Sequence, residues 1–595
     1  MKKILLSISL CFIVNCLSAQ TSYPKEIEAQ ISQVENNLFS RIILNGKADN
    51  IVDRMTYYKV KGLSIAVVNN YELVWAKGYG WADEDEKQRV TTTTLFKPGS
   101  ISKSLNAVGV LKLAQENKLD INKDINDYLK SWKFPYDSLS KGKKITTANL
   151  LSHTAGLSVY GGFPGYDAKA NIPTIPQILD GAAPANTPAV RSMFEPEMQF
   201  QYSGGGTIIS QLIITDLTKE PYEKYMFEHV LKPLGMTNSF YSVAPPKKNE
   251  LKKYAMGYTK DGIKVDATFR IYPEQAPLGL WTTPSDLAKY IIETQLAYKG
   301  KSAKVLNQQM ASLQLTPYID YSATMGAFIG DRNGEKYFFH DAGNEGYRGL
   351  YYGNVEGGNG VVIFVNSDEG NIILELLNSV ADVYNWKGFD KPKNVNTLTV
   401  PESITQKYTG VYLYEGKLAE ITKEKDGLVY WANNQSCKMY FTSEHDFINV
   451  EFPTEKSFII DSLGNVTGYS RILNGDVKPP ATKVLREELL KTNEGELNYF
   501  GWHLLETKRF ATAILYLNRG LELEPNDNSI INNLAHSYLF NNEFDKAIKL
   551  YQTFISKIPN DESIQKNIIK DDFMYFQKIG FDKVQITKAT VELKL

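Results

Sequence analysis

The stretch Phe96-Lys-Pro-Gly-Ser100-Ile-Ser-Lys103-Ser-Leu-Asn106 carries the strongest signal in this chain, because it places a serine and a lysine one helical turn apart. Pro98 and Gly99 interrupt the preceding segment, and the apolar spacing after them predicts a helix from Ser100 to about residue 117. A spacing of three residues puts the Lys103 ammonium on the same helix face as the Ser100 hydroxyl. A serine becomes a nucleophile once a base takes its proton, and a buried lysine with a lowered pKa can do so.

The motif alone has a second interpretation, in which Ser100 caps the helix and Lys103 is an exposed surface lysine. Two further Ser-x-x-Lys matches, at 138–141 and 140–143, lie in a Lys-rich polar stretch without the apolar spacing of a helix. We interpret those two as a solvated loop. The choice between the two interpretations of Ser100 therefore depends on the rest of the chain.

Composition narrows the class of protein. A chain of 595 residues is too long for one core and predicts three or four units. The formal net charge of -1 offers no basic field for nucleic acid or for an anionic membrane surface. The six histidines show no metal-ligand spacing, and Gly204-Gly-Gly206 lacks the lysine and hydroxyl residue of a phosphate loop. We therefore expect no nucleic-acid partner, no metal and no organic cofactor.

Residues 1–19 have the pattern of a secretory signal peptide. Two lysines precede the apolar run 4–17, and the small-residue sequence Leu-Ser-Ala19 follows. A single N-terminal membrane anchor is the alternative, but the run is short for a span. We expect export to the periplasm or to the outside of a bacterial cell, with no transmembrane segment in the mature chain.

Residues 20–395 predict one α+β domain. The stretches 62–68 and 72–78 form a hairpin joined at Asn69-Asn70, and strands return at 337–340, 350–352 and 360–366. Helical stretches lie between these two groups of strands. The pattern predicts an antiparallel sheet built from both ends of the domain, flanked by helices and carrying an inserted helical subdomain.

Residues 396–482 change character and predict a small antiparallel β-barrel. Short strands recur there at regular spacing, for example at 408–413 and 447–452, with turns such as Asp461-Ser-Leu-Gly-Asn465 between them. Pro479-Pro480 is interpreted as a linker to the next part of the chain.

Residues 488–595 are helical and repetitive. Phe510 recurs as Phe544, and Pro525-Asn-Asp recurs as Pro559-Asn-Asp, each after 34 residues. This period, with paired helices closed by a proline, resembles the tetratricopeptide repeat. We predict two repeats and a further helix near 573–579, forming a docking module for a protein partner. The alternative is a helical cap packed on the β-barrel.

Three further motifs follow the first stretch in an informative order: Leu150-Leu-Ser-His153-Thr-Ala-Gly-Leu157, Phe200-Gln-Tyr202-Ser-Gly-Gly-Gly206 and Phe339-His340-Asp-Ala-Gly343-Asn-Glu-Gly-Tyr347. Together the four stretches resemble the serine β-lactamase and penicillin-binding hydrolase family. Its members include class C β-lactamases, D-aminopeptidases, D-alanyl-D-alanine carboxypeptidases and β-lactamase-like esterases. The resemblance covers about residues 45 to 390 and implies an α/β sandwich of the β-lactamase/transpeptidase type.

The resemblance also implies roles for individual residues. Ser100 would be the acyl-accepting nucleophile, and Lys103 would share its proton network. Tyr202 would act as a general base, with its pKa lowered by two nearby cations. His340 would hold the tyrosine hydroxyl or a substrate carboxylate, and the backbone N–H groups of Ser100 and Gly343 would form the oxyanion hole. His153 would support the wall of the cleft in a structural role.

Two positions depart from the family pattern. The family's Tyr-Ser-Asn is Tyr202-Ser-Gly204 here. That asparagine normally contacts the substrate amide, and glycine cannot. The departure therefore favours ester or altered amide substrates. The family's His-x-Gly is His340-Asp-Ala342, which puts a methyl group where substrate lies close to the strand. Shifting the register to Gly343 would restore the glycine but displace the histidine.

These observations predict an exported serine hydrolase that cleaves an amide or ester through an acyl-enzyme on Ser100. Expected substrates are D-amino-acid peptides, peptidoglycan-type fragments or small esters, with β-lactams a poorer fit. The alternative is a catalytically weak or inactive binding protein that acts as a scaffold through its repeats. Gly204 and Ala342 favour this alternative, whereas the intact serine, lysine and tyrosine argue against it.

Overall fold

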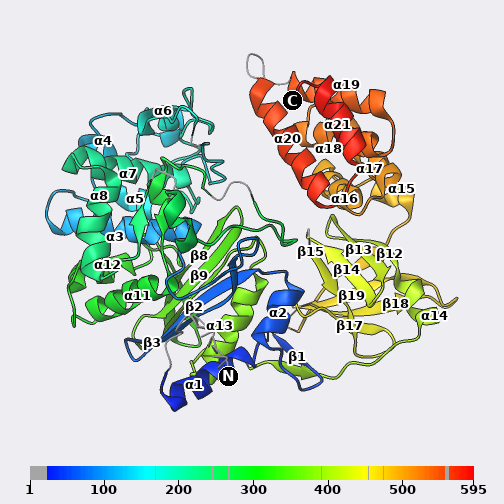
Figure 1. The fold of residues 1–595 in the computed structure, drawn as a ribbon, viewed down its shortest axis with the longest axis horizontal. Coiled ribbons are helices and arrows are strands. Elements are labelled where there is room, and N and C mark those ends of the chain that lie inside the picture. Colours follow the sequence, from blue (N-terminus) through cyan, green and yellow to red (C-terminus); the bar gives the residue numbers. More distant parts are fainter. Residues whose placement is uncertain are drawn as a thin grey trace, which may run out of the picture. The chain divides into compact units, whose positions relative to one another are not determined.

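The computed structural model describes residues 23–39, 41–167, 169–242, 247–265, 269–389, 391–433, 435–452, 454–473, 475–556 and 562–595. The predicted signal peptide lies outside these residues. The chain divides into two compact units, which are described separately. The first comprises the chain up to Phe39 together with Ala48–Lys391, and the second comprises Ser40–Lys47 together with Pro392–Leu595 (Figure 1).

The first unit contains a seven-stranded antiparallel sheet with the strand order β4-β3-β2-β10-β9-β8-β7. Its strands are β2 (Gly62–Asn69), β3 (Glu72–Asp83), β4 (Gln88–Arg89), β7 (Phe328–Arg332), β8 (Glu335–Asn344), β9 (Tyr347–Asn354) and β10 (Gly360–Val365). Strand β2, from the N-terminal part, pairs directly with β10, so that Ile65 lies opposite Ile363. The predicted antiparallel sheet, built from both ends of the domain, is thereby confirmed.

The two faces of this sheet bury side chains in two different cores, as the alternation of a strand requires. Ile65 and Ile363 belong to one core, which includes residues of α1 (Lys25–Glu35), α2 (Ile51–Tyr57) and α13 (Asn371–Val383). Ala66 and Val362 belong to the other, which includes residues of α3 (Ser102–Gln115) and α11 (Pro284–Tyr298). The sheet is thus flanked by helices on both faces (Figure 1).

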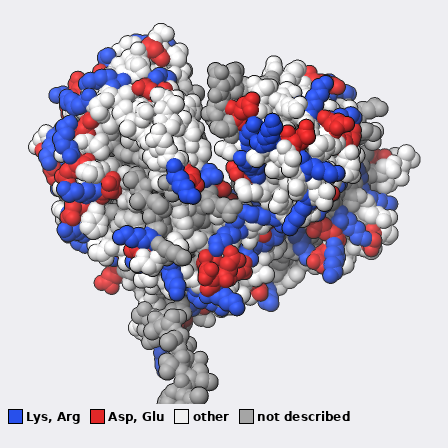
Figure 2. Space-filling view, turned by 45° about the horizontal axis from the view of Figure 1, so that its top comes forward, with Lys and Arg blue, Asp and Glu red and all other residues white. Residues whose placement is uncertain are grey.

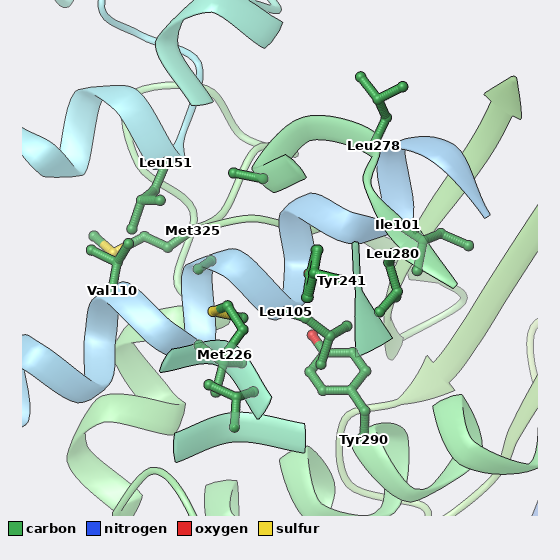
Figure 3. Close-up of a cluster of buried hydrophobic side chains, with 14 of the residues drawn as sticks. Ile101, Leu105, Val110, Leu151, Met226, Tyr241, Leu278, Leu280, Tyr290 and Met325 are labelled. Atoms are coloured by element: carbon green, nitrogen blue, oxygen red, sulfur yellow. The ribbon is translucent and has the colours of Figure 1, made fainter. Parts of the chain in front are cut away.

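The second core also contains the segments inserted between β4 and β7. They are α4 (Ile125–Tyr128), α5 (Thr147–Leu151), α6 (Ile175–Asp180), α7 (Gly204–Thr218), α8 (Tyr222–Met226), α9 (Lys232–Leu234), α10 (Gln275–Leu278), α12 (Gln308–Gln314) and the short strands β5 (Phe240–Tyr241) and β6 (Leu280–Trp281). Helix α3 runs through their centre and is buried on all sides. Figure 3 shows Ile101, Leu105 and Val110 among apolar side chains from several of these segments. This packing holds the first turn of α3 in a rigid setting.

The second unit begins with a nine-stranded antiparallel sheet in the order β15-β14-β13-β12-β20-β19-β18-β17-β16. The strands are β12 (Gly410–Tyr414), β13 (Lys417–Glu424), β14 (Gly427–Ala432), β15 (Gln435–Lys438), β16 (Tyr440–Phe441), β17 (Asp446–Ile448), β18 (Thr454–Ile460), β19 (Val466–Leu473) and β20 (Asp476–Lys483). A separate parallel pair joins β1 (Ile42–Leu44) to β11 (Lys393–Val395).

The assignment of Pro479-Pro480 as a linker is wrong, because both prolines lie within β20. The pairing of β20 with β19 shifts register between Tyr469 and Arg471, opposite these prolines. Proline has no N–H to donate, so it fits a strand only at an edge or at such a bulge.

The remaining helices of the second unit are α14 (Glu402–Thr405), α15 (Arg486–Leu489), α16 (Glu494–Glu506), α17 (Phe510–Leu523), α18 (Asn528–Phe540), α19 (Phe544–Ile555), α20 (Glu562–Lys578) and α21 (Lys583–Glu592). Helices α17 and α19 begin at the two phenylalanines of the repeat. The second Pro-Asn-Asp, at 559–561, falls outside the described residues. The C-terminal region is therefore helical, and its assignment to the tetratricopeptide class stays a prediction.

These helices pack on the sheet of the same unit. Arg509 donates two hydrogen bonds to the buried Glu420 of β13, and the ring of His503 in α16 stacks on Trp431 of β14 at 4.2 Å. Such packing is what the helical-cap alternative requires, and it leaves a docking role for the outer surface as a prediction.

On the face drawn in Figure 2, basic and acidic side chains are interspersed. Within the described residues, no helix is both long and apolar enough to cross a bilayer.

Candidate functional site

Ser100 lies in the 3-10 turn η1 (Gly99–Ile101), which leads directly into α3. The α-helix thus begins at Ser102, two residues later than expected. Gly99 has a φ of +51°, and a Cβ atom there would lie 2.8 Å from the carbonyl oxygen of Gly343 in β8. Both facts require glycine. The close approach places Ser100 beside the end of strand β8.

Lys103 is 4% exposed and points back toward the serine. Its Nζ donates to Ser100 Oγ at 3.0 Å and to the carbonyl oxygen of Pro277 at 3.0 Å. Burial lowers the pKa of Lys103 to about 7. Near neutral pH a substantial part of this lysine is therefore a neutral amine, the form that can accept a proton from Ser100.

Tyr202 immediately precedes Ser203, the N-cap residue of α7. Its ring centroid lies 5.0 Å from Lys103 Nζ, and Tyr202 lines the same pocket as Ser100. The serine, the lysine and the tyrosine therefore meet, although they come from distant parts of the chain.

The expected lowering of the Tyr202 pKa is wrong, because burial raises this pKa well above its ordinary value. Burial disfavours the phenolate, and the two nearby basic groups that were expected to stabilise it carry little positive charge near neutral pH. Lys103 is only partly charged there, and His340 has a pKa lowered to about 4. In the resting site Tyr202 is a neutral phenol.

His340 lies on β8, and its side chain is 3% exposed. Burial, with a smaller effect of Lys103, lowers its pKa to about 4, so the ring is neutral. Its Nδ1 lies 2.5 Å from the carbonyl oxygen of Asp341, which can only accept, so Nδ1 carries the proton. The ring lies 6.4 Å from that of Tyr202, between centroids.

His153 stacks against Tyr202, with ring centroids 4.2 Å apart. Its Nδ1 accepts a hydrogen bond from the backbone N–H of Ser203 at 3.2 Å, and its pKa is lowered, mainly by burial. These contacts orient the residue that faces Ser100. These contacts are compatible with the expected structural role of His153, which stays a prediction.

The end of β8 forms one wall of the site. Strand β7 pairs with β8 only as far as Phe339, opposite Phe328, so the segment from His340 onward extends past Phe328, the first residue of β7. Ala342 and Gly343 both line the pocket here. This geometry is compatible with the expected oxyanion donors, the N–H groups of Ser100 and Gly343, and that role stays a prediction.

The pocket around Ser100 has a volume of about 770 Å³. Ser100, Lys103, Tyr202 and His340 all line it, whereas Gly204 is not among its described lining residues. Sequence reasoning missed most of the walls. Aromatic walls come from Tyr160, Phe163, Phe200, Tyr272 and Phe328, and charged groups from Asp341, Glu345, Arg348 and Asp368. Arg348 Nη1 pairs with Asp368 Oδ1 at 2.9 Å.

Known proteins resemble this chain over the part that contains the pocket. The family model described as Beta-lactamase matches residues 48–378, more than half of the chain. Protein flp of Staphylococcus aureus (strain N315) is 27% identical over 330 residues, or 54% of this chain and 63% of that protein. The putative penicillin-binding protein PbpX of Bacillus subtilis (strain 168) is 30% identical over 251 residues, or 41% of this chain and 56% of that protein. The chain thus spans less than two thirds of the length of these curated relatives.

Among solved structures, the octameric penicillin-binding protein homologue from Pyrococcus abyssi is similar with a TM-score of 0.51 at 22% identity, covering 73% of this chain and 98% of that one. At this identity the likeness concerns the fold alone. The match of the family model covers the sheet, helix α3 and every residue predicted for the site. The chain therefore belongs to the beta-lactamase family.

Proposed function

We propose that this protein is an exported serine hydrolase that cleaves an ester or amide through a covalent acyl-enzyme on Ser100. The observation that carries the proposal is the 3.0 Å contact between Ser100 Oγ and the buried Nζ of Lys103, whose pKa is lowered to about 7. A nucleophile and a base in hydrogen-bond contact are the minimum for acyl transfer. The neutral Tyr202 beside them adds a group that can deliver a proton.

In the first step, neutral Lys103 takes the Ser100 proton while Oγ bonds to the substrate carbonyl carbon. The carbonyl electron pair moves onto oxygen, where backbone N–H groups of Ser100 and Gly343 would stabilise it. The bond to the leaving group then breaks. Tyr202 gives its phenolic proton to that group, and the Lys103 ammonium restores the phenol.

In the second step, water attacks the acyl carbon and gives its proton to Lys103. The bond to Ser100 Oγ breaks, and the lysine returns the proton to the serine as the acid product leaves. Neither step uses a cofactor.

The substrate class follows from the departures at Gly204 and Ala342. We propose small esters, D-amino-acid peptides or peptidoglycan-type fragments as substrates, with β-lactams a poorer fit. The charged and apolar pattern of residues 1–19 supports export. The C-terminal helices, with their 34-residue period, support a docking surface for a protein partner.

Labelling with a fluorophosphonate tests the proposal directly. The protein should gain the mass of one adduct on the peptide that contains Ser100, and Ser100→Ala should reduce labelling at least about 1,000-fold. Ser138→Ala, which removes the exposed serine of another Ser-x-x-Lys match, is the matched control and should label normally.

A parallel incubation with a fluorescent penicillin separates the activities. A persistent adduct indicates a penicillin-binding protein, rapid loss of the adduct indicates a β-lactamase, and labelling by fluorophosphonate alone indicates an esterase. Equal labelling of the wild-type protein and Ser100→Ala contradicts the proposal, and an unreactive wild-type protein favours a binding module.

His153→Leu should lower kcat about tenfold and change KM little, because the tyrosine loses its stacking ring and Ser203 loses its hydrogen-bond acceptor. His153→Gln keeps an oxygen that can accept from the Ser203 N–H and should retain more activity. The pH midpoint of the rate should stay near 7, since Lys103 is untouched. An unchanged kcat in His153→Leu would remove the positioning role.

A further inference from the structure

The loop between α5 and α6 folds over the first turn of α7. The backbone N–H of Gly204 donates to the carbonyl oxygen of Tyr160 at 2.9 Å, and that of Gly205 donates to Val159 at 3.0 Å. Ser203 Oγ donates to the carbonyl oxygen of Ser158 at 2.7 Å. The first N–H groups of a helix lack partners within it, and here the loop satisfies two of them.

The packing of this loop on α7 explains why the residue after Tyr202-Ser203 is glycine. A Cβ atom on Gly204 would lie 2.7 Å from Phe163 Cε2, 2.9 Å from Phe163 Cζ and 3.2 Å from the carbonyl oxygen of Tyr160. Gly204 lies in helix α7, and its φ is outside the left-handed range, so backbone conformation does not demand glycine. Space does, because the Phe163 ring occupies the volume that a side chain at position 204 would need.

Phe163 faces the reaction site in place of that missing side chain. Its ring lines the pocket with Ser100 and Tyr202, whereas Gly204 is not among the described lining residues. Other aromatic rings continue the same wall, since Tyr160 lies 5.0 Å from Tyr202 and Phe200 lies 6.1 Å from Phe328, between ring centroids. A polar amide at position 204 is thus replaced by a hydrocarbon surface.

We propose that Phe163 determines the specificity of the site by selecting acyl groups with an apolar substituent over acyl groups with an amide at the same place. The inference rests on the proposed function, because it concerns the substrate of the Ser100 acyl-enzyme. An amide pressed against Phe163 would lose water without gaining a hydrogen-bond partner, which is costly. A branched hydrocarbon of the same shape would gain contact with the ring.

A matched pair of substrates tests this preference. The p-nitrophenyl esters of 4-methylpentanoic acid and N-acetylglycine share the leaving group and nearly the same shape, but the second has an amide in place of a hydrocarbon segment. The wild-type kcat/KM should favour the 4-methylpentanoyl ester at least about tenfold. Phe163→Ala should lose most of that preference, and Phe163→Leu should keep it.

The double variant Phe163→Ala with Gly204→Asn should reverse the direction of the preference, because it removes the ring and supplies an amide. The side chain of Gly204→Asn alone would clash with Phe163, so this single variant should be poorly tolerated. The effects of the two changes on activity should therefore be strongly non-additive. The fluorophosphonate labelling rate serves as the control for folding and for the chemistry of Ser100.

The two proposals fail in different ways. If the wild-type protein labels with fluorophosphonate but hydrolyses both esters equally, the role of Phe163 is overturned and the serine hydrolase proposal stands. The same holds if Phe163→Ala labels normally and keeps the full preference. If the wild-type protein does not label and cleaves neither ester, both proposals are overturned.

Discussion

Lys103→Met should lower the rate of Ser100 acylation about 1,000-fold at pH 8, since methionine fills the buried volume but cannot take the serine proton. The wild-type amine lies 3.0 Å from Ser100 Oγ, and burial lowers its pKa to about 7. The release of p-nitrophenol from a 4-methylpentanoyl ester measures this rate in a stopped-flow instrument.

The pH dependence identifies the same residue independently. Burial lowers the pKa of Lys103 to about 7, and only the neutral amine accepts a proton. The wild-type rate should therefore be low at acid pH and rise as pH increases through about 7. In Lys103→Met the residual rate should show no rise over this range.

Lys97 provides a matched control, because burial lowers its pKa to about 7 as well. Its Nζ lies 4.4 Å from the ring centroid of Tyr272 and 5.1 Å from that of Trp281, and it does not line the pocket. Lys97→Met should keep the rise near pH 7. If the rise disappears in Lys97→Met and persists in Lys103→Met, the assignment of the base is wrong.

The parts of the first unit that follow short-range rules could be predicted. The strand around Ile65 and the strand around Ile363 are apolar runs, and the turn at Asn69-Asn70 joins two segments that pair as a hairpin. The serine and lysine motif depends on a spacing of three residues. Lys103 still contacts Ser100, even though the α-helix begins only at Ser102. Domain limits and partners stay predictions.

The pocket walls could not be predicted in the same way. Tyr160 and Phe163 lie in a loop without periodicity, and Phe328 joins them from a strand more than 150 residues later. The sequence did contain one signal for this packing. Three consecutive glycines at 204–206 begin a helix, although glycine destabilises a helix relative to most other residues. The close packing that explains the first two, Gly204 and Gly205, is visible only in three dimensions.

The error about Tyr202 has a different origin. Sequence reasoning counted nearby cations, but it could not measure how deeply the phenol and those cations are buried. Burial raises the pKa of the tyrosine and lowers that of the lysine, so each group favours its neutral form. Nearby charges predict the direction of a pKa shift only where the group is still exposed to solvent.

Tyr202→Phe should lower the hydrolysis of an ethyl ester of 4-methylpentanoic acid about 1,000-fold. In the resting site burial keeps Tyr202 a neutral phenol, which can donate a proton but is a poor base. Ethoxide is a poor leaving group and needs that proton as the bond breaks. The measurement is the rate of acid formation followed by mass spectrometry.

The p-nitrophenyl ester of the same acid makes this prediction specific, because p-nitrophenolate leaves without a proton. Its acylation rate should fall only about tenfold in Tyr202→Phe, a loss of orientation rather than of chemistry. If Tyr202 were the base that activates Ser100, both esters would lose the same factor, since Ser100 must be deprotonated in either case. Equal losses would therefore return the role of base to the tyrosine, and unequal losses leave it with Lys103.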